Sequence, residues 1–427
     1  MPRSLVATVC LLLLSLGGAS AADTPPPDPG VTADGVLELR PVETPPAPVP
    51  LPALPAPPAT LLPVRPDGGL VQPLPPPRAV LHTVKAYYVG YAPDSFEAVR
   101  RYVSAVDIVA GQWLAVSAGG QLTEARDHAR NDEVRRIVRQ AGRRVYTCVV
   151  NAGFDRAVLS AVLNNRERRT AVADRIVAFV ERKGDDGVDL DFEGVRPGHQ
   201  DGYTAFVREL AEKLHARGKE LCLAVDASWD GSPSPGYDYR ALSQYADSIM
   251  PMTYTFGPGS VPIAPIDYLE KAAAKGTTLM EPRKFMIGMG VYGRSCDLRT
   301  GRRTTPNSAI IRSLLERYAP EVVFDPETLT KRFRYQDEGG REHIVFFDDP
   351  ETIGGKLARL ADRHQVGAVG FWRMGQEDPS LWELIQVASA RRRPTTAGLG
   401  ARTGAWRAWP LLNWAGLMSA PPGEVAL

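Results

Sequence analysis

Acidic and apolar residues alternate in one short segment of the chain, which reads DDGVDLDFEG at positions 185–194. Successive side chains of an extended strand point to opposite faces. Asp189, Asp191 and Glu193 would therefore line one face, with about 6–7 Å between successive Cα atoms. Carboxyl groups of like charge this close together share protons, which raises the pKa of at least one of them. The segment is thus expected to supply a general acid that works near neutral pH.

A structural role is the alternative interpretation of these carboxylates. Burying even one unpaired carboxylate costs several kcal/mol. A structural role would therefore require cations spaced to match, and the segment itself contains no Lys, Arg or His. A solvated acidic edge conflicts with the apolar residues that would cover the opposite face. We therefore interpret the segment as catalytic.

The central part of the chain, between positions 82 and 389, repeats a regular pattern of β-rich stretches. Stretches with continuous apolar character are typical of strands that are covered by helices on one face and by a core on the other. Eight strands are predicted: Val84–Val89, Val106–Ala110, Arg144–Val150, Gly187–Phe192, Leu221–Asp226, Ser248–Thr253, Phe285–Val291 and Ala368–Trp372.

Amphipathic stretches separate most of these strands. In 203–217, Phe206, Leu210 and Leu214 recur at i, i+4 and i+8, which predicts a helix, and 166–183 shows a similar pattern. Eight strand–helix units favour an α/β fold, a closed (β/α)8 TIM barrel. A doubly wound open sheet is the alternative, but the chain lacks a Gly-rich phosphate-binding motif.

The chain outside the barrel differs in composition. Segment 1–21, with an apolar core at Leu5–Leu16 and small residues after it, has the pattern of a signal peptide, and an uncleaved membrane anchor is the alternative. Segment 22–80 is Pro-rich and is expected to be a disordered linker. The barrel is expected over 81–390. The tail, 391–427, contains three tryptophans and is expected either to be poorly ordered or to dock on another surface.

Charge and cysteine content exclude several classes of protein. Lys+Arg number 50 and Asp+Glu 49, a net charge of +1, which argues against nucleic acid or an anionic membrane as the main partner. No apolar run reaches the ~20 residues that span a bilayer. Without Cys10, the three remaining cysteines (Cys148, Cys222 and Cys296) cannot all pair. The six histidines are scattered, so no metal and no cofactor are expected.

Four motifs in order resemble those of glycoside hydrolase family 18, the chitinase and N-acetylglucosaminidase family. The first is the acidic segment, in which Asp186, Asp189, Asp191 and Glu193 match the DxxDxDxE signature. The others are MTY at 252–254, IGMGVYGR at 287–294 and GFWRMGQED at 370–378. The resemblance extends from Val84 to Ile385, and it is greatest to the compact bacterial branch that includes spore-cortex and cell-wall hydrolases.

The resemblance implies a role for each site residue. Glu193 would protonate the glycosidic oxygen while the substrate's own 2-acetamido oxygen attacks the anomeric carbon. Asp191 would hold the acetamido N–H, and Asp189 would share a proton with Asp191. Tyr254 would orient the acetamido carbonyl, and Trp372 would form the floor beneath the sugar. A rim aromatic and a core tryptophan are the structural alternatives for the last two.

Other residues are expected to contact the substrate or to modify the groove. Tyr88 and Asn151 end the first and third strands, and Met252 and Asp186 belong to the motifs, so all four are assigned to substrate binding. Thr255 stands where the family usually has Asp, which removes a charge. The loop after strand seven is expected to hold a small insertion, with a hairpin over 333–347, that forms a reduced wall of the groove.

Two classes of function follow from the resemblance. The first is an exported hydrolase that cleaves β-1,4 bonds next to N-acetylglucosamine in chitin or peptidoglycan. The second is a chitinase-like lectin that binds the sugar with little or no turnover, but such proteins usually lose one of the four signature carboxylates, which this chain keeps. The expected partner is the polysaccharide itself. The expected state is a monomer in the periplasm, the cell wall or the medium.

Overall fold

The computed structural model describes residues 81–254, 256–257 and 259–390. The predicted signal peptide at 1–21, the Pro-rich linker at 22–80 and the tail at 391–427 lie outside the described residues, as does Thr255.

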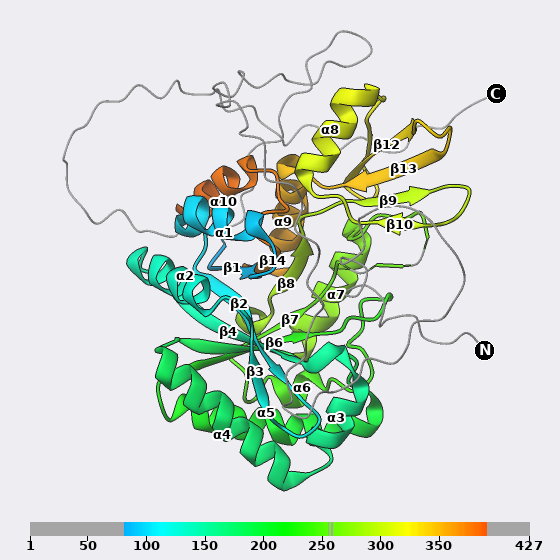
Figure 1. Ribbon diagram of the computed structural model, residues 1–427. Helices are drawn as coiled ribbons and strands as arrows, with labels where there is room; N and C mark the ends of the chain where they lie inside the picture. The colour runs from blue at the N-terminus through cyan, green and yellow to red at the C-terminus, as the bar shows by residue number, and fades with distance from the viewer. Residues whose placement is uncertain (1–80, 255, 258, 391–427) are drawn as a thin grey trace, which may run out of the picture. The chain divides into compact units, whose positions relative to one another are not determined.

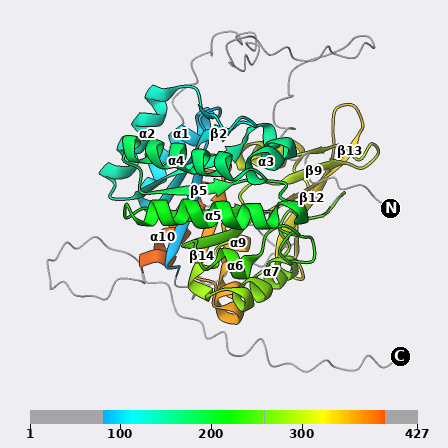
Figure 2. The ribbon, with the colours of Figure 1, turned by 90° about the horizontal axis from the view of Figure 1, so that it is seen from below.

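Eight parallel strands form the centre of the molecule (Figures 1 and 2). Neighbouring strands pair in the order β7-β6-β5-β4-β2-β1-β14-β8, and a parallel bridge between Ile249 and Phe285 joins β7 to the segment that leads into β8. The prediction of a closed (β/α)8 barrel is therefore confirmed, and each of the eight predicted strands overlaps an observed one. The strands are β1 Thr83–Tyr88, β2 Ile108–Val116, β4 Arg144–Asn151, β5 Gly187–Asp191, β6 Glu220–Val225, β7 Ser248–Pro251, β8 Ile287–Gly290 and β14 Ala368–Trp372.

Helices surround this sheet and cover its outer face (Figure 2). They are α1 Pro93–Tyr102, α2 His128–Gln140, α3 Arg156–Leu163, α4 Arg166–Lys183, α5 Gln200–His215, α6 Tyr239–Leu242, α7 Ile266–Leu279, α9 Pro350–His364 and α10 Ser380–Ala390. A short strand, β3 Leu122–Glu124, pairs antiparallel with the end of β2. Within the described part of the chain, none of the helices is long and apolar enough to cross a membrane.

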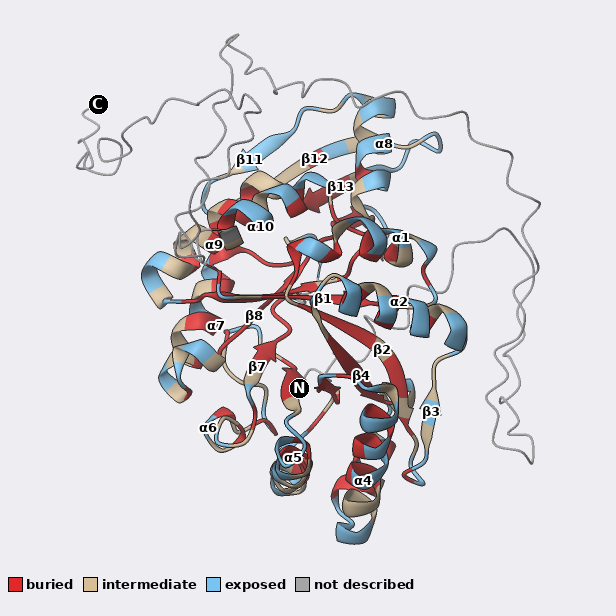
Figure 3. Ribbon diagram, turned by 90° about the vertical axis from the view of Figure 1, so that its left-hand side faces the viewer, coloured by how far each residue is buried: buried red, intermediate tan, exposed pale blue. Residues whose placement is uncertain are grey.

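Helix α4 illustrates how local sequence sets these boundaries. The Asn165 side chain accepts a hydrogen bond from the Arg168 backbone N–H, which caps the helix at its start. Gly184 ends it in the left-handed conformation, at φ 68°, which glycine adopts without a Cβ clash. The helix covers the predicted range, and its face with Val172 and Ile176 is buried against the strands (Figure 3).

An insertion follows β8 and forms a second, smaller sheet. Its five antiparallel strands pair in the order β10-β9-β13-β12-β11 and pack against helix α8 Ser308–Tyr318 through a small core of Ile311, Phe333, Val345 and Phe347. The predicted hairpin is present as β12 and β13, but the insertion has three further strands that the sequence did not predict. The strands are β9 Arg294–Asp297, β10 Arg303–Thr304, β11 Val323–Asp325, β12 Thr330–Gln336 and β13 Glu342–Phe347.

A buried ion-pair network lies at the end of the barrel where β5 begins. Asp185 is fully buried and accepts hydrogen bonds from Arg135 Nε (3.0 Å), Arg139 (2.8 Å) and the Thr147 hydroxyl (2.6 Å). Arg135 is itself buried and also contacts the half-exposed Asp132 at 3.1 Å. This network fixes helix α2 and strand β4 to the turn that starts the acidic strand.

Loss of the buried partner of Arg135 should cost far more stability than loss of the exposed one. Asp185→Asn removes the buried counter-ion of Arg135 and leaves only the half-exposed Asp132, and we expect the free energy of unfolding to fall by about 3–5 kcal/mol. Asp132→Asn, at the same arginine, should cost about 1 kcal/mol or less because water replaces the lost contact. Urea unfolding of both variants measures the difference, and equal costs would contradict the role assigned to the network.

Candidate active site

Strand β5 carries Asp189 and Asp191 toward the inside of the barrel. The alternation predicted from the sequence holds, because Phe192 points the other way and stacks on Phe206 of helix α5 with ring centroids 5.6 Å apart. Both aspartates are buried, and one oxygen of each, Asp189 Oδ2 and Asp191 Oδ1, has no hydrogen-bond partner among the described residues. The two carboxyl groups thus face the barrel interior with hydrogen-bonding capacity left over.

A cation that the acidic segment lacks comes from strand β1. Lys85 is fully buried, and its Nζ donates to Asp189 Oδ1 at 2.8 Å. Nζ also lies 3.0 Å from the Tyr87 hydroxyl and 3.1 Å from Cys222 Sγ. Burial alone would lower the pKa of Lys85, but the charge of Asp189 raises it above the usual value. The acidic segment itself contains no cation, and the one that pairs with Asp189 comes from a strand that is distant in sequence.

Asp191 has no such cation in contact within the described part of the chain. Burial, then the charges of Asp189 and Asp226, raise its pKa to about 8, while Lys85 acts in the opposite direction. The thiol of Cys148 lies close by, with Sγ 4.0 Å from Asp191 Oδ2. The pKa of Asp191 is therefore raised, as the sequence predicted for at least one member of this acidic group.

Glu193 lies two residues beyond the end of β5, in a turn that its neighbours hold rigidly. The Asn151 side chain accepts from the Glu193 backbone N–H at 2.9 Å and donates to the Glu193 carbonyl at 3.3 Å. Asp226 accepts from the next backbone N–H, that of Gly194, at 2.8 Å, and from the Tyr237 hydroxyl at 3.1 Å. Asn151 was predicted to contact sugar, and in the structure its amide fixes the backbone that carries Glu193.

Tyr254 and Trp372 lie at the same end of the barrel. Tyr254 follows β7 and is largely buried, as is Met252, and Trp372 is the half-buried last residue of β14. The Tyr87 ring connects the two to the carboxylates, because its centroid lies 5.2 Å from that of Trp372. Burial raises the pKa of the Tyr87 hydroxyl, and the nearby charges of Asp189 and Asp191 and the presence of Tyr254 add to this effect. The structure therefore brings these predicted residues together.

Two predicted substrate contacts lie elsewhere. Tyr88 faces outward from β1, where its ring packs 6.2 Å from that of Trp113, and burial raises its pKa to about 12 beside charged residues of helix α2. The inward residue of that strand is Tyr87, so the prediction was one position out of register. Asp186 precedes β5 at the opposite end of the barrel from Glu193, and its carboxylate accepts from the Val145 backbone N–H at 2.8 Å.

Three residues of the site were missed in the sequence: Lys85, Tyr87 and Asp226. A signal for the first two was present, since a lysine two positions before a tyrosine in an otherwise apolar strand places both on the inner face. Asp226 follows strand β6 beside the turn of Glu193, and burial raises its pKa. No local pattern distinguished this aspartate from others that follow strands.

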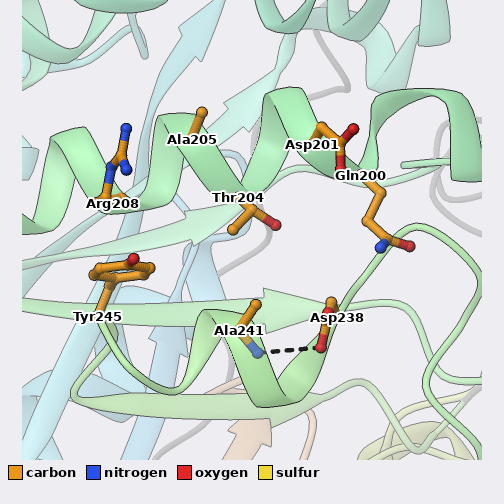
Figure 4. A pocket seen from close by; sticks show the side chains of 8 residues that line it. All are labelled: Gln200, Asp201, Thr204, Ala205, Arg208, Asp238, Ala241 and Tyr245. Atoms are coloured by element: carbon orange, nitrogen blue, oxygen red, sulfur yellow. Dashed lines mark hydrogen bonds between the residues drawn. The ribbon is translucent and has the colours of Figure 1, made fainter.

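A separate polar pocket lies on the outside of the barrel, between helices α5 and α6 (Figure 4). The close-up shows Tyr245 below Arg208, with Asp238 accepting from the Ala241 backbone N–H at 3.1 Å to cap α6. Its walls come from helices rather than strand ends, so it is not part of the carboxylate site. The residues that line it are Gln200, Asp201, Thr204, Ala205, Arg208, Asp238, Ala241 and Tyr245.

Comparison with protein families agrees with this fold and with the arrangement of the carboxyl groups. The sequence model described as Glycosyl hydrolases family 18 matches residues 94–377. The chain belongs to this family. All four carboxylates of the family's signature lie within the matched residues.

Two bacterial proteins are similar to this chain over part of their length. The chain is 28% identical over 255 residues to a putative sporulation-specific glycosylase of Bacillus subtilis, a match that covers 58% of this chain and 60% of the relative. It is 26% identical over 251 residues to the cortical fragment-lytic enzyme of Bacillus cereus, covering 56% of this chain and 58% of the relative. The matches thus span less than two thirds of both relatives.

A solved structure shows the same fold along its whole length. The chitinase of Chromobacterium violaceum has a TM-score of 0.67 at 25% identity, and the match covers 73% of this chain and 99% of the chitinase. The spore cortex-lytic enzyme of Bacillus cereus has a TM-score of 0.66 at 24% identity, and that match covers 75% of this chain and 77% of the enzyme.

The raised pKa of Asp191 predicts a pH-dependent cost in stability. The unfolded chain releases this proton near pH 4 and the folded chain near pH 8, so the folded state binds the extra proton in between and stability falls as pH rises through that window. Asp191→Asn cannot lose a proton. We therefore expect the stability of the variant to rise relative to that of the parent across this window, by up to about 1.4 kcal/mol for each pH unit.

Urea unfolding at several pH values checks this prediction. The matched control is Asp174→Asn, at a surface position on α4 where the side chain is 58% exposed. Its stability difference from the parent should be nearly constant over the same window. A difference for Asp191→Asn that does not change with pH would mean that this carboxyl group is ionised throughout.

Proposed function

We propose that this chain is a glycoside hydrolase that cleaves β-1,4 bonds next to N-acetylglucosamine, in peptidoglycan or chitin. Membership of family 18 supports the reaction class. The observation that carries the proposal is the line of carboxyl groups along β5, in which buried Asp191 lies between ion-paired Asp189 and Glu193 at the strand end. Active sites of such barrels lie at this end of the strands.

Glu193 is assigned the proton transfer. Its carboxylic acid gives a proton to the glycosidic oxygen as the bond to the anomeric carbon breaks. The acetamido carbonyl oxygen of the same sugar forms the new bond to that carbon, so no second carboxylate has to attack. The ionised Glu193 then takes a proton from the water that opens the cyclic intermediate, which restores the acid and releases the sugar.

The remaining inner residues are assigned to holding the substrate's acetamido group and ring. Asp191 is assigned to the acetamido N–H, which aims the carbonyl oxygen at the anomeric carbon, and Asp189 adjusts the charge on Asp191. Tyr254 is assigned to the acetamido carbonyl. Trp372, half-buried beside Tyr87, is assigned to the apolar face of the sugar ring. Met252 belongs to the apolar core of the barrel and is assigned to the wall of the site.

Asn151 and Asp226 support Glu193 through its backbone rather than through the substrate. Three of their hydrogen bonds fix the turn at Glu193 and Gly194. A general acid has to be held in a narrow range of positions relative to the oxygen that it protonates. Their assigned function is therefore to restrict the position of Glu193.

We infer the substrate from the names of the relatives, and the location from the composition of the segments that flank the barrel. The relatives are named as a sporulation-specific glycosylase, a cortical fragment-lytic enzyme and a chitinase, which supports both peptidoglycan and chitin as substrates. We propose that residues 1–21 direct export, that 22–80 link the barrel to its surroundings and that 391–427 form a tail. The barrel acts as a monomer on a polymer outside the cytoplasm.

The role of Glu193 separates a hydrolase from a sugar-binding protein. Glu193→Gln keeps the size of the side chain but has no proton to give, so turnover of chitin oligomers and purified peptidoglycan should fall by at least about 10²-fold. Binding of the same oligomers, measured by calorimetry, should persist. If the parent binds without releasing products, as judged by mass spectrometry, the chain is a lectin.

The acetamido group provides a second test of the same proposal. A thiazoline analogue of N-acetylglucosamine, which resembles the cyclic intermediate, should inhibit competitively. Fully deacetylated oligomers of the same length should not be cleaved, because they lack the attacking oxygen. Equal initial rates on acetylated and deacetylated oligomers would require a different nucleophile.

A further inference from the structure

Lys85, Asp189 and Asp191 occupy the interior of the barrel beneath the proposed sugar site, and they are unequally paired. Lys85 and Asp189 form an ion pair at 2.8 Å with both side chains fully buried. Asp191 has no cation in hydrogen-bond contact among the described residues, and one of its oxygens has no partner there. Asymmetric pairing of this kind determines which of the two carboxyl groups carries a proton.

The surroundings of Lys85 fit an ammonium ion. An ammonium has three N–H bonds, and Nζ lies within 3.1 Å of three acceptors: Asp189 Oδ1, the Tyr87 hydroxyl and Cys222 Sγ. The Tyr87 ring also lies beneath it, with its centroid 4.8 Å away. A buried cation of this kind needs an anion beside it, and Asp189 is the carboxyl group in contact.

We propose that Lys85 is a positioning residue for the reaction: it holds the negative charge on Asp189, so that the proton of the Asp189–Asp191 pair resides on Asp191. This inference rests on the proposed function and refines it. The two carboxyl groups then do not share the proton equally. Asp191 is the one that carries it when the substrate binds.

Charged and titratable groups surround Asp191 from several elements, and the proposal depends on their balance. Asp189 and Asp226 favour the protonated form of Asp191, and Lys85 is the cation that opposes them. Three buried groups add no charge at neutral pH, because burial and then the nearby aspartates raise their pKa values: Tyr87, Cys148 and Tyr203. The other groups that face this cluster are Cys222 from β6 and Tyr254 after β7.

Carboxyl ¹³C NMR of aspartate-labelled protein tests the proposal without any need for turnover. Asp189→Asn and Asp191→Asn identify the two signals. In the parent, the Asp191 signal should titrate near pH 8, and at pH 6, taken as about two units below that midpoint, the Asp189 signal should be that of an ionised carboxylate. A protonated Asp189 beside an ionised Asp191 under those conditions would overturn the proposal, and this measurement needs no change at Lys85.

Substitution of Lys85 provides the second arm. Lys85→Gln removes the charge but keeps a hydrogen-bond donor, so at pH 6 the Asp189 signal should move toward that of a protonated carboxyl group, because Asp189 then shares the proton with Asp191. Lys85→Arg restores the charge and should return the Asp189 signal to that of an ionised carboxylate. The pH dependence of kcat/KM on chitin oligomers should change in Lys85→Gln and return in Lys85→Arg. An Asp189 signal that stays fully ionised in Lys85→Gln at pH 6 would contradict the role of Lys85.

Lys356 is the matched control for loss of a buried ammonium. It is fully buried on α9 and pairs with Asp348 at 2.6 Å, just after β13 ends. Lys356→Gln should lower stability but leave the Asp189 and Asp191 signals and the pH profile unchanged. An equal change of these signals in Lys356→Gln would mean that the effect of Lys85→Gln comes from a general loss of packing. If the parent shows the NMR titration but no turnover, the proposed function fails and the inference about the charges holds.

Discussion

The enclosure of two carboxyl groups and one ammonium inside the barrel is the constraint on which the site depends. Each charge would be costly alone at this depth, because the surrounding side chains cannot replace water. Lys85 and Asp189 neutralise each other, and burial raises the pKa of Asp191, which favours its uncharged form. In our proposal, one lysine on β1 thus decides which of the two carboxyl groups on β5 carries the proton.

This arrangement also explains why the site lies where it does. Parallel strands end at one rim, so Glu193, Asp226, Tyr254 and Trp372 arrive from four different strands at the same place. The rigid parts of the site use backbone groups, because Asn151 and Asp226 hold the turn at Glu193 through its main chain. In the proposed reaction, the proton of Glu193 moves while the backbone that carries Glu193 stays fixed.

The sequence predicted most of the fold because the relevant patterns are local. The eight strands follow from short apolar stretches and helix α4 from its periodicity, both of which show directly in the sequence. Alternation along β5 correctly placed Asp189 and Asp191 inside. The failures concern contacts between distant segments. Lys85 lies 104 residues from the carboxylate that it neutralises, and no pattern within the acidic segment could reveal it. Tyr88 was chosen because it lies at the end of the first predicted strand, whereas only the register of β1 decides whether Tyr87 or Tyr88 faces inward. The insertion was underestimated because its outer strands are short and exposed, as Figure 3 shows for β11, so they carry little hydrophobic periodicity.

The stereochemistry of the first product tests the central claim most directly. Attack by the substrate's own acetamido oxygen, followed by attack of water on the opposite face, replaces the bond twice and keeps the β configuration. Proton NMR recorded in the first minutes of cleavage of an N-acetylglucosamine oligomer should therefore show the β anomer in excess, before mutarotation converts it. An initial excess of the α anomer would mean a single direct displacement by water and would contradict this account.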